Sequence, residues 1–220
     1  MLVCGVDDAG RGSVLGPLVI AGVLVDHKEI GRLVNLGVKD SKLLSPARRN
    51  ELAPEIVKIV RSHYVVRLSP AEIDEVVETG SKLHRLNRLE AHAMAEVIAF
   101  LKPDVAYVDA SDVLPKRYAE HIAEKVPFKV EIVSEHKADR TYPVVSAASI
   151  IAKVERDKAI AELTRIYGNL GSGYCSDPET MAFLKDWVKS HGSYPEHVRK
   201  SWIPSKKIAA AQSALQRNLF

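Results

Sequence analysis

Residues 2–12 read LVCGVDDAGRG, and this opening stretch decides both the fold and the chemistry to expect. Its apolar first half predicts a buried strand, and two carboxylates, Asp7 and Asp8, follow directly. Carboxylates at a strand end suit a hard divalent cation such as Mg²⁺ or Mn²⁺. The alternative is a solvated turn, which is the commoner role of an Asp-Asp pair after a strand.

The Gly10-Arg11-Gly12 turn that follows the acids suits a phosphate group. Glycine has no side chain, so the backbone can approach a ligand closely, and a guanidinium binds phosphate with two hydrogen bonds. The acids and the turn together predict metal-dependent chemistry on a phosphodiester. Taken alone, the glycines would also suit an ordinary turn.

Strands and helices alternate along the rest of the chain, which predicts an α/β fold. We expect strands at residues 2–7, 17–26, 63–68, 105–109 and 129–133. Helices are expected from Ser45, from a capping box at Ser69–Glu72, and over 83–101, 147–167 and 178–190. Pro195 and Pro204 should break the remainder into short helices. We therefore expect a catalytic domain over 1–180 and a basic helical C-terminal subdomain over 181–220.

The charge is distributed unevenly over the 220 residues. Residues 185–220 hold seven Lys/Arg against two acids, a net charge of +5; the whole chain carries +3, so residues 1–184 carry −2. An acidic body with a basic tail that contains Trp187 and Trp202 fits a metal site beside a grip for a polyanion. Alternatively, the tryptophans pack the tail while its lysines are solvated; both interpretations can hold.

Nothing in the sequence predicts export or a membrane segment. Met1 leads directly into a strand, without a basic segment or a cleavage site, and the longest apolar stretch, 14–25, is too short for a membrane helix. Cys4 and Cys175 make no disulfide framework. We expect a cytoplasmic protein with no membrane association.

Two further acids occupy positions like that of Asp7. Asp109 ends the strand at 105–109, and Asp139 comes after the strand at 129–133. Facing carboxylates cannot all ionise without a counter-charge, and bound divalent metals remove that cost. Two such ions can promote an in-line phosphoryl displacement. Spacing alone leaves open that Asp109 and Asp139 are separate solvated turn residues.

The chain resembles a known family, ribonuclease H type II, and its length and helical tail resemble those of archaeal members. The resemblance runs in order from residue 2 to about 190. It rests on DDAGRG (7–12), GPLV (16–19), KDSK (39–42), LNRLE (86–90), YVD (107–109), KAD (137–139), VSAASIIAK (145–153) and GSGYCSDP (171–178).

The resemblance implies a ribonuclease-H-like mixed five-stranded sheet flanked by helices. It implies an endonuclease that hydrolyses the RNA strand of RNA–DNA hybrids and incises at ribonucleotides embedded in duplex DNA, leaving 3′-hydroxyl and 5′-phosphate ends. Such an enzyme would use two Mg²⁺ or Mn²⁺ ions and serve ribonucleotide excision repair and DNA replication. We expect a monomer, with a sliding clamp as a candidate protein partner.

The family's functional positions map onto residues of this chain. Its four catalytic, metal-binding acids correspond to Asp7, Asp8, Asp109 and Asp139. Its substrate-binding positions correspond to Gly10, Arg11 and Gly12, to Tyr174, and to Ser41 and Lys42. The resemblance implies that the glycine-rich turn reads the ribose 2′-hydroxyl and adjoining phosphate, that Tyr174 stacks on the sugar at the RNA–DNA junction, and that Ser41 and Lys42 contact phosphate.

Asp8 departs from the family pattern, in which this acid is usually glutamate. Aspartate is one methylene shorter, so its reach shrinks by about 1.5 Å, one bond's length. Because the charge is kept, we expect activity with an altered metal preference or rate.

Several other polar residues have ordinary explanations. His84 and His92 are expected to be surface or packing residues on a helix, whereas His136, near the acids, is a candidate for substrate contact or proton transfer. Lys153 and Arg156 are expected on a solvated helix face, with phosphate contact as the alternative.

Two rival functions stay open. One is a related nuclease that resolves DNA junctions; the other is a non-catalytic nucleic-acid-binding protein, against which the intact acids argue.

Overall fold

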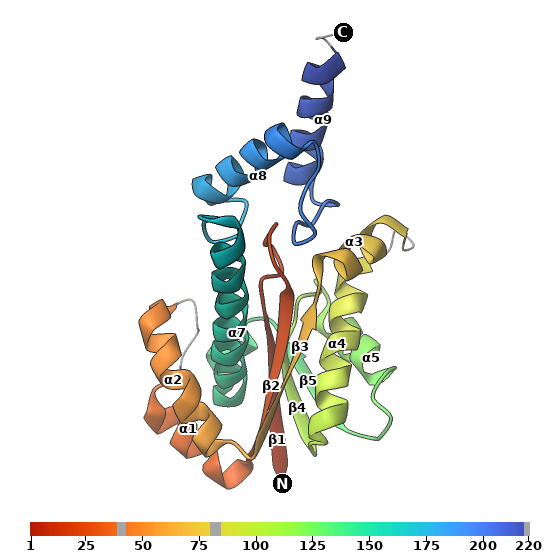
Figure 1. Cartoon of the computed structure of the whole chain (residues 1–220). Coiled ribbons are helices and arrows are strands. Elements are labelled where there is room, and N and C mark those ends of the chain that lie inside the picture. The colour runs from red at the N-terminus through yellow and green to blue at the C-terminus, as the bar shows by residue number, and fades with distance from the viewer. Residues whose placement is uncertain (39–42, 80–84, 218–220) are drawn as a thin grey trace. The chain divides into compact units, whose positions relative to one another are not determined.

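A computed structural model describes residues 1–38, 43–79 and 85–217, and it contains a five-stranded sheet (Figure 1). The order across the sheet is β3-β2-β1-β4-β5. β1 pairs antiparallel with β2 and parallel with β4, and β4 pairs parallel with β5, so the expected mixed sheet is confirmed. The strands are β1 (Leu2–Ala9), β2 (Leu18–Asp26), β3 (Ser62–Leu68), β4 (Val105–Asp109) and β5 (Glu131–Glu135).

The central strands are covered on both faces, as their apolar sequences require. Every residue of β2 from Leu18 to Val25 is buried. Two glycines let helices approach the sheet closely: a Cβ on Gly5 would lie 2.2 Å from a backbone carbon of Val144, and one on Gly22 would lie 2.3 Å from a methyl carbon of Val97. Neither position accepts a side chain without moving the helix that covers it.

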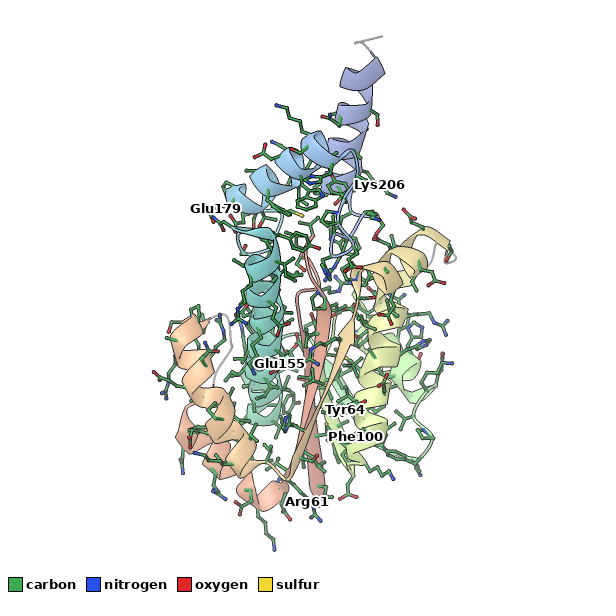
Figure 2. All side chains as sticks on the ribbon, in the orientation of Figure 1. Arg61, Tyr64, Phe100, Glu155, Glu179 and Lys206 are labelled. Carbon is green, nitrogen blue, oxygen red and sulfur yellow. The ribbon has the colours of Figure 1, made fainter. Side chains whose placement is uncertain are left out.

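Helices α1 (Ile30–Leu36), α2 (Pro46–Ile59) and the first half of α7 (Pro143–Tyr167) pack on one face of the sheet (Figure 1). Helices α4 (Arg85–Leu101) and α5 (Pro115–Ala123) cover the other face. Near the sheet edge, Tyr64 of β3 stacks on Phe100 of α4 with ring centroids 4.0 Å apart (Figure 2). Two short helices, η1 (His27–Glu29) and α6 (Ala138–Thr141), complete this layer arrangement.

The chain forms two compact units, each discontinuous in sequence. The first, here called the sheet unit, comprises Met1–Ala9, Val19–Arg67 and Lys82–Glu155. The second, the helical unit, comprises Gly10–Leu18, Leu68–Ser81 and Arg156–Phe220, and holds α3 (Pro70–Thr79), the end of α7, α8 (Pro178–His191) and α9 (Ile203–Arg217). These limits differ from the division expected at residue 180, which stays a prediction. Across the described residues, no helix is long and apolar enough to cross a bilayer.

Several local expectations were tested. The capping box is confirmed: the Ser69 N–H donates to Glu72 Oε2 over 2.8 Å, and the Glu72 N–H donates to Ser69 Oγ over 3.3 Å. The expected break at Pro204 is wrong, because α9 is one helix of 15 residues with this proline in its first turn, where no helical N–H is needed. Helices α1 and α5 were not predicted, α7 begins four residues before the expected 147, and β5 lies two residues beyond its expected place.

Candidate active site

Asp7 is a buried carboxylate near the end of β1, with only 4% of its surface exposed. Burial raises its pKa well above the ordinary value, and the negative charges of Asp8 and Asp109 raise the pKa further. Hydrogen bonds from the Ser149 side chain and from the Asp8 N–H, which lies 2.7 Å from Asp7 Oδ1, act in the opposite direction. Asp7 therefore ionises readily only if positive charge comes close.

The sheet register explains why Asp109 lies near Asp7. β1 and β4 run parallel, with Val6 opposite Val108, so the next residue of each strand is an aspartate. Asp109 Oδ1 accepts a hydrogen bond from the Ala138 N–H over 2.8 Å. The structure thus brings Asp7, Asp8 and Asp109 together at the carboxyl ends of two central strands.

Asp139 lies one residue beyond the N–H that binds Asp109. It is 5% exposed in the short helix α6, and its carbonyl oxygen accepts a hydrogen bond from Ser146 Oγ. Within residues 1–38, 43–79 and 85–217, no three Asp, Glu, His or Cys side chains form a ready-made metal-binding group. The convergence of all four acids on metal therefore stays a prediction.

The chemistry of these donors nevertheless fits a divalent cation. Carboxylate oxygens are the ligands that Mg²⁺ and Mn²⁺ prefer. A buried acid whose pKa is raised further by two neighbouring acids carries an electrostatic cost that such an ion would remove. Repulsion between the carboxylates also explains why a closed ligand set need not exist before an ion arrives.

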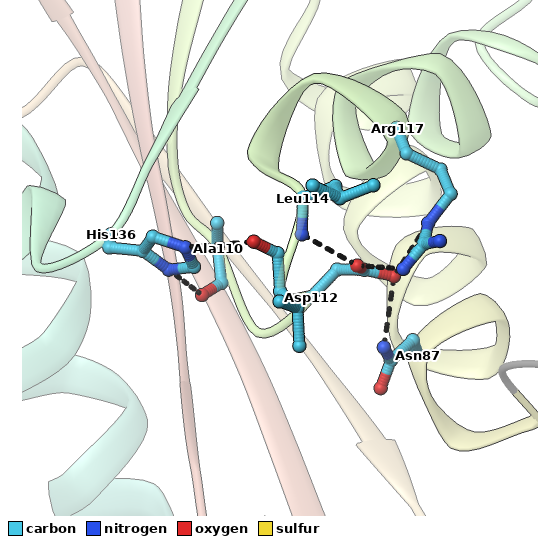
Figure 3. Close-up of polar contacts among 7 residues, drawn as sticks. Asn87, Ala110, Asp112, Leu114, Arg117 and His136 are labelled. Atoms are coloured by element: carbon cyan, nitrogen blue, oxygen red, sulfur yellow. Dashed lines mark hydrogen bonds and ion pairs between the residues drawn. The ribbon is translucent and has the colours of Figure 1, made fainter.

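Asp112 anchors the loop that follows Asp109 (Figure 3). It is fully buried and accepts hydrogen bonds from the Leu114 N–H (2.9 Å), Asn87 Nδ2 (3.0 Å) and Arg117 Nε (3.2 Å). Burial alone would raise the pKa of Asp112, but the bonds from Arg117, Leu114 and Asn87 hold the pKa well below its ordinary value. Sequence reasoning missed this residue, because its partners lie 25 residues before and five after it.

His136 holds the same loop from its other side (Figure 3). Its ring nitrogens lie 3.2 Å from the carbonyl oxygen of Ala110 and 3.4 Å from that of Val113. Between these two residues, Ser111 Oγ lies 3.4 Å from Asp8 Oδ1. His136 therefore supports the loop that contacts the acidic centre, and its expected part in substrate contact or proton transfer stays a prediction.

The predicted glycine turn and the loop of Tyr174 meet within the helical unit. Ser13 and Tyr174 form an antiparallel bridge, and the carbonyl of Gly173 accepts from the N–H groups of Val14 (2.8 Å) and Leu15 (3.1 Å). Gly10 has φ +90°, a conformation that favours glycine. Two segments about 160 residues apart in the sequence thus form one hydrogen-bonded structure.

Two basic residues occupy places that the sequence did not predict. Arg156 was expected on a solvated face of α7, but it is 2% exposed, so that expectation is wrong. Arg199 was counted among the basic residues of the tail, yet it is fully buried and its guanidinium lies 5.0 Å from the ring of Trp202. Trp187 also packs, stacking on His191 with centroids 4.0 Å apart. Both tryptophans therefore have a packing role.

The other predicted residues lie either outside the described part of the chain or on helices α4 and α7. Ser41, Lys42 and His84 lie outside the described residues, so their expected roles stay predictions. His92 is half-buried on α4, where burial lowers its pKa, which agrees with a packing role. Lys153 is half-buried on α7.

Comparison with known proteins gives one consistent result. The family model described as ribonuclease HII matches residues 4–205. The chain belongs to the ribonuclease HII family. A ribonuclease HII of Thermococcus sibiricus is 49% identical over 210 residues, which cover 94% of this chain and 91% of that protein.

Solved structures of the family agree with the fold. The ribonuclease H2 from Pyrococcus horikoshii OT3 has a TM-score of 0.89 at 44% identity, covering 97% of this chain and 99% of its own. The ribonuclease HII in a complex with PCNA from Archaeoglobus fulgidus has a TM-score of 0.83 at 46% identity, covering 92% and 95%. The expected family, fold and enzyme class, a ribonuclease H, are confirmed.

Proposed function

We propose that this ribonuclease HII is an endonuclease that hydrolyses the RNA strand of RNA–DNA hybrids and incises duplex DNA at single embedded ribonucleotides. Products would carry 3′-hydroxyl and 5′-phosphate ends. The observation that carries the proposal is the buried carboxylate of Asp7, crowded by Asp8 and Asp109 at the ends of β1 and β4. Family membership supplies the reaction class.

Two divalent ions are the group that this acidic centre would hold, with Asp7, Asp8, Asp109 and Asp139 as ligands. When bound, they would activate water and stabilise the leaving oxygen of the phosphodiester. The protein's own part is to hold the ligands in place. The Ala138 N–H orients Asp109, and the Ser149 side chain and the Asp8 N–H orient Asp7.

Ribose would be distinguished from deoxyribose by the glycine turn and Tyr174. RNA differs from DNA at such a site by its 2′-hydroxyl, which both donates and accepts hydrogen bonds. Among the described residues, no heavy atom outside Arg11–Ser13 lies within 4 Å of where a Cβ of Gly12 would stand, so this part of the chain leaves the backbone open to a ligand. Tyr174, half-buried beside it, offers an aromatic face for a sugar.

One experiment separates this function from its rivals. Cleavage is measured in Mg²⁺ and in Mn²⁺ on two DNA duplexes of identical sequence, one all-DNA and one with a single ribonucleotide, and on an all-DNA four-way junction. We expect incision only of the ribonucleotide-containing strand. Cleavage of an all-DNA junction, without a need for ribose, would favour a junction-resolving nuclease. Binding without cleavage in either metal would favour a non-catalytic protein.

We also propose a sliding clamp as a partner, because a structural neighbour at 46% identity was solved in a complex with PCNA. Binding to a purified clamp of the same organism tests this, and stimulation of cleavage on clamp-loaded DNA would support it. The expected monomer is tested by light scattering in solution. The expected cytoplasmic location stays a prediction.

A further inference from the structure

Arg156 and Arg199 are the two largest side chains of the chain's described part that are almost completely buried, with 2% and 0% exposure. Burying a guanidinium costs several kcal/mol unless hydrogen bonds replace its hydration. Both residues belong to the helical unit. Their hydrogen-bond partners show what these buried charges hold in place.

Arg199 binds three carbonyl groups of a single loop. Its Nη1 donates to the carbonyl of Arg11 over 2.7 Å, and its Nη2 donates to the carbonyls of Gly10 (2.7 Å) and Gly16 (3.2 Å). The Gly10 carbonyl also accepts from Ser13 Oγ over 2.8 Å. The planar guanidinium thus fixes the peptide planes on both sides of Arg11.

This arrangement sets the direction of the N–H groups in the glycine turn. In a trans peptide, the C=O and the N–H point in opposite directions. Because the carbonyls of Gly10 and Arg11 point at the guanidinium, the N–H groups of Arg11 and Gly12 point away from it. Those are donors that a substrate hydroxyl or phosphate would need, so Arg199 prepares them before binding.

Arg156 contacts the loop of residues 172–174, which contains Tyr174. Its Nη2 donates to the carbonyl of Ser172 over 2.6 Å, and its guanidinium carbon lies 4.5 Å from the centre of the Tyr174 ring. A Cβ on Gly173 would lie 2.7 Å from Arg156 Nη2, so the loop backbone at Gly173 packs directly against the guanidinium of Arg156. The bridge between Ser13 and Tyr174 connects it to the turn that Arg199 holds.

We propose that Arg156 and Arg199 are positioning residues for ribose discrimination: Arg199 orients the N–H donors of the glycine turn, and Arg156 orients the ring of Tyr174. This inference rests on the proposed function, which assigns ribose reading to these two loops. Neither arginine contacts the nucleic acid. Lysine would keep the positive charge, but it cannot reproduce the planar set of donors that reaches three carbonyl groups.

The test measures binding rather than turnover. In an Asp109→Asn background, which prevents cleavage, dissociation constants in Mg²⁺ are measured by fluorescence anisotropy for two duplexes that differ by one ribonucleotide. The ratio of the two constants is the discrimination. We expect Arg199→Lys to lower this ratio by about tenfold, the size of effect of one lost charge-assisted hydrogen bond, while the affinity for all-DNA duplex stays within about twofold.

The ratio separates positioning from general stability. A variant that merely lowers the folded fraction weakens both affinities alike and leaves the ratio unchanged. Arg165→Lys is the matched control, because Arg165 is exposed on α7 in the same unit, and it should keep the ratio of the background. Circular dichroism and thermal unfolding report whether each variant is folded.

Each outcome decides the matter. A folded Arg199→Lys protein that keeps the background ratio overturns the inference and leaves the proposed function standing. If Arg199→Lys does not fold, Arg156→Lys is judged by the same ratio: a lowered ratio supports the inference and an unchanged one overturns it. If the Asp109→Asn protein without further changes shows no preference for the ribonucleotide duplex, the proposed ribose reading is wrong, and the inference that rests on it is wrong as well.

Discussion

Asp7 of the sheet unit and Arg199 of the helical unit are charged residues buried in opposite kinds of environment. In the sheet unit, Asp7 is buried beside two other acids, and these neighbours raise its pKa. In the helical unit, Arg199 is buried against carbonyl oxygens that accept hydrogen bonds from its two Nη atoms. The first environment leaves a charge that an ion from solution can compensate, whereas in the second the protein's own carbonyl groups bind the buried charge. Burial of a charge therefore indicates a ligand site only when its neighbours repel it.

Asp112 shows that the contrast depends on surroundings and not on residue type. It is an aspartate of the sheet unit, three residues from Asp109, yet hydrogen bonds from Asn87, Leu114 and Arg117 satisfy it. Its pKa is lowered where that of Asp7 is raised. The same side chain is thus structural in one place and suited to metal in the other.

The largest expected effect comes from removing a charge at the acidic centre. Asp109→Asn should lower Mg²⁺-dependent cleavage by about a thousandfold or more, because a lost metal ligand removes several kcal/mol of transition-state stabilisation. Hybrid binding should change by no more than a few-fold. Single-turnover cleavage and filter binding measure the two. Glu120→Gln, an exposed carboxylate of α5, is the matched control. Cleavage by Asp109→Asn at near wild-type rate would show that the active site is elsewhere.

The second effect is on stability and tests whether Asp112 is structural. Asp112→Ala should lower the free energy of unfolding by about 2–3 kcal/mol, since it leaves buried donors without an acceptor. Because the pKa of Asp112 is lowered in the folded state, its contribution is complete at neutral pH and is lost as the pH falls below the ordinary carboxylate range, about 4.

Urea unfolding at pH 7 and pH 3 measures this dependence. The difference between the wild-type protein and Asp112→Asn should be smaller at pH 3. Asp186→Asn, exposed on α8, should show little difference at either pH. A gap that is equally wide at both pH values would mean that ionisation of Asp112 adds no stability.

The sequence predicted those parts of the fold that depend on local pattern. The apolar runs of β1 and β2 and the capping box at Ser69 were found because period and capping chemistry are local. Helix α5 and the late start expected for α7 were errors in which a local signal was missed, because both helices begin at a proline, Pro115 and Pro143. The strand ends also predicted that Asp7 and Asp109 lie at the same edge of the sheet, and the register of β1 and β4 agrees; their role as metal ligands stays a prediction.

The buried arginines could not have been predicted in the same way. Arg156 lies in a helix of mixed composition, where its charge indicates solvent, and Arg199 lies in a basic segment that reads as a surface for phosphate. Their buried guanidinium groups donate to the carbonyl groups of Gly10, Arg11, Gly16 and Ser172, which are distant in sequence and carry no side-chain signal. Only tertiary structure shows that these arginines face inward.

A smaller effect tests whether the exposed tail lysines differ in function from buried Arg199. Replacing Lys185, Lys189 and Lys200 with glutamine should weaken substrate binding by about tenfold and reduce the slope of log affinity against log salt, because fewer counterions are released. All three are exposed. The matched control replaces Lys28, Lys58 and Lys125, exposed residues of the sheet unit; Lys28 follows β2 beside the start of β1, away from Asp7. An unchanged salt slope would leave the tail with packing as its role.

The smallest expected effect concerns Asp8, whose carboxylate is one methylene shorter than the glutamate usual in the family. Asp8→Glu should shift the ratio of Mg²⁺- to Mn²⁺-supported cleavage by a few-fold, because one ligand arm lengthens by about 1.5 Å. Binding of substrate without metal should barely change. The Ser111 hydroxyl, 3.4 Å from Asp8 Oδ1, lies in the loop that Asp112 anchors, so the surroundings of Asp8 are connected to that hydrogen-bonded loop.

Cleavage rates in each metal are compared for both proteins on a duplex with one ribonucleotide, and Ser111→Ala is measured alongside. If the Ser111 hydroxyl limits the space beside residue 8, removing it should let the longer glutamate fit. The double variant Asp8→Glu, Ser111→Ala should then show a larger shift in the ratio of Mg²⁺- to Mn²⁺-supported cleavage than Asp8→Glu alone. Equal ratios for all variants would mean that the pocket absorbs the missing methylene, and that Asp8 does not tune the metal requirement. Loss of activity in Asp8→Glu, regained with Ser111→Ala, would show instead that the anchored loop is fitted to aspartate. The hydrogen-bonded loop that Asp112 anchors would then set the space available to the side chain at position 8.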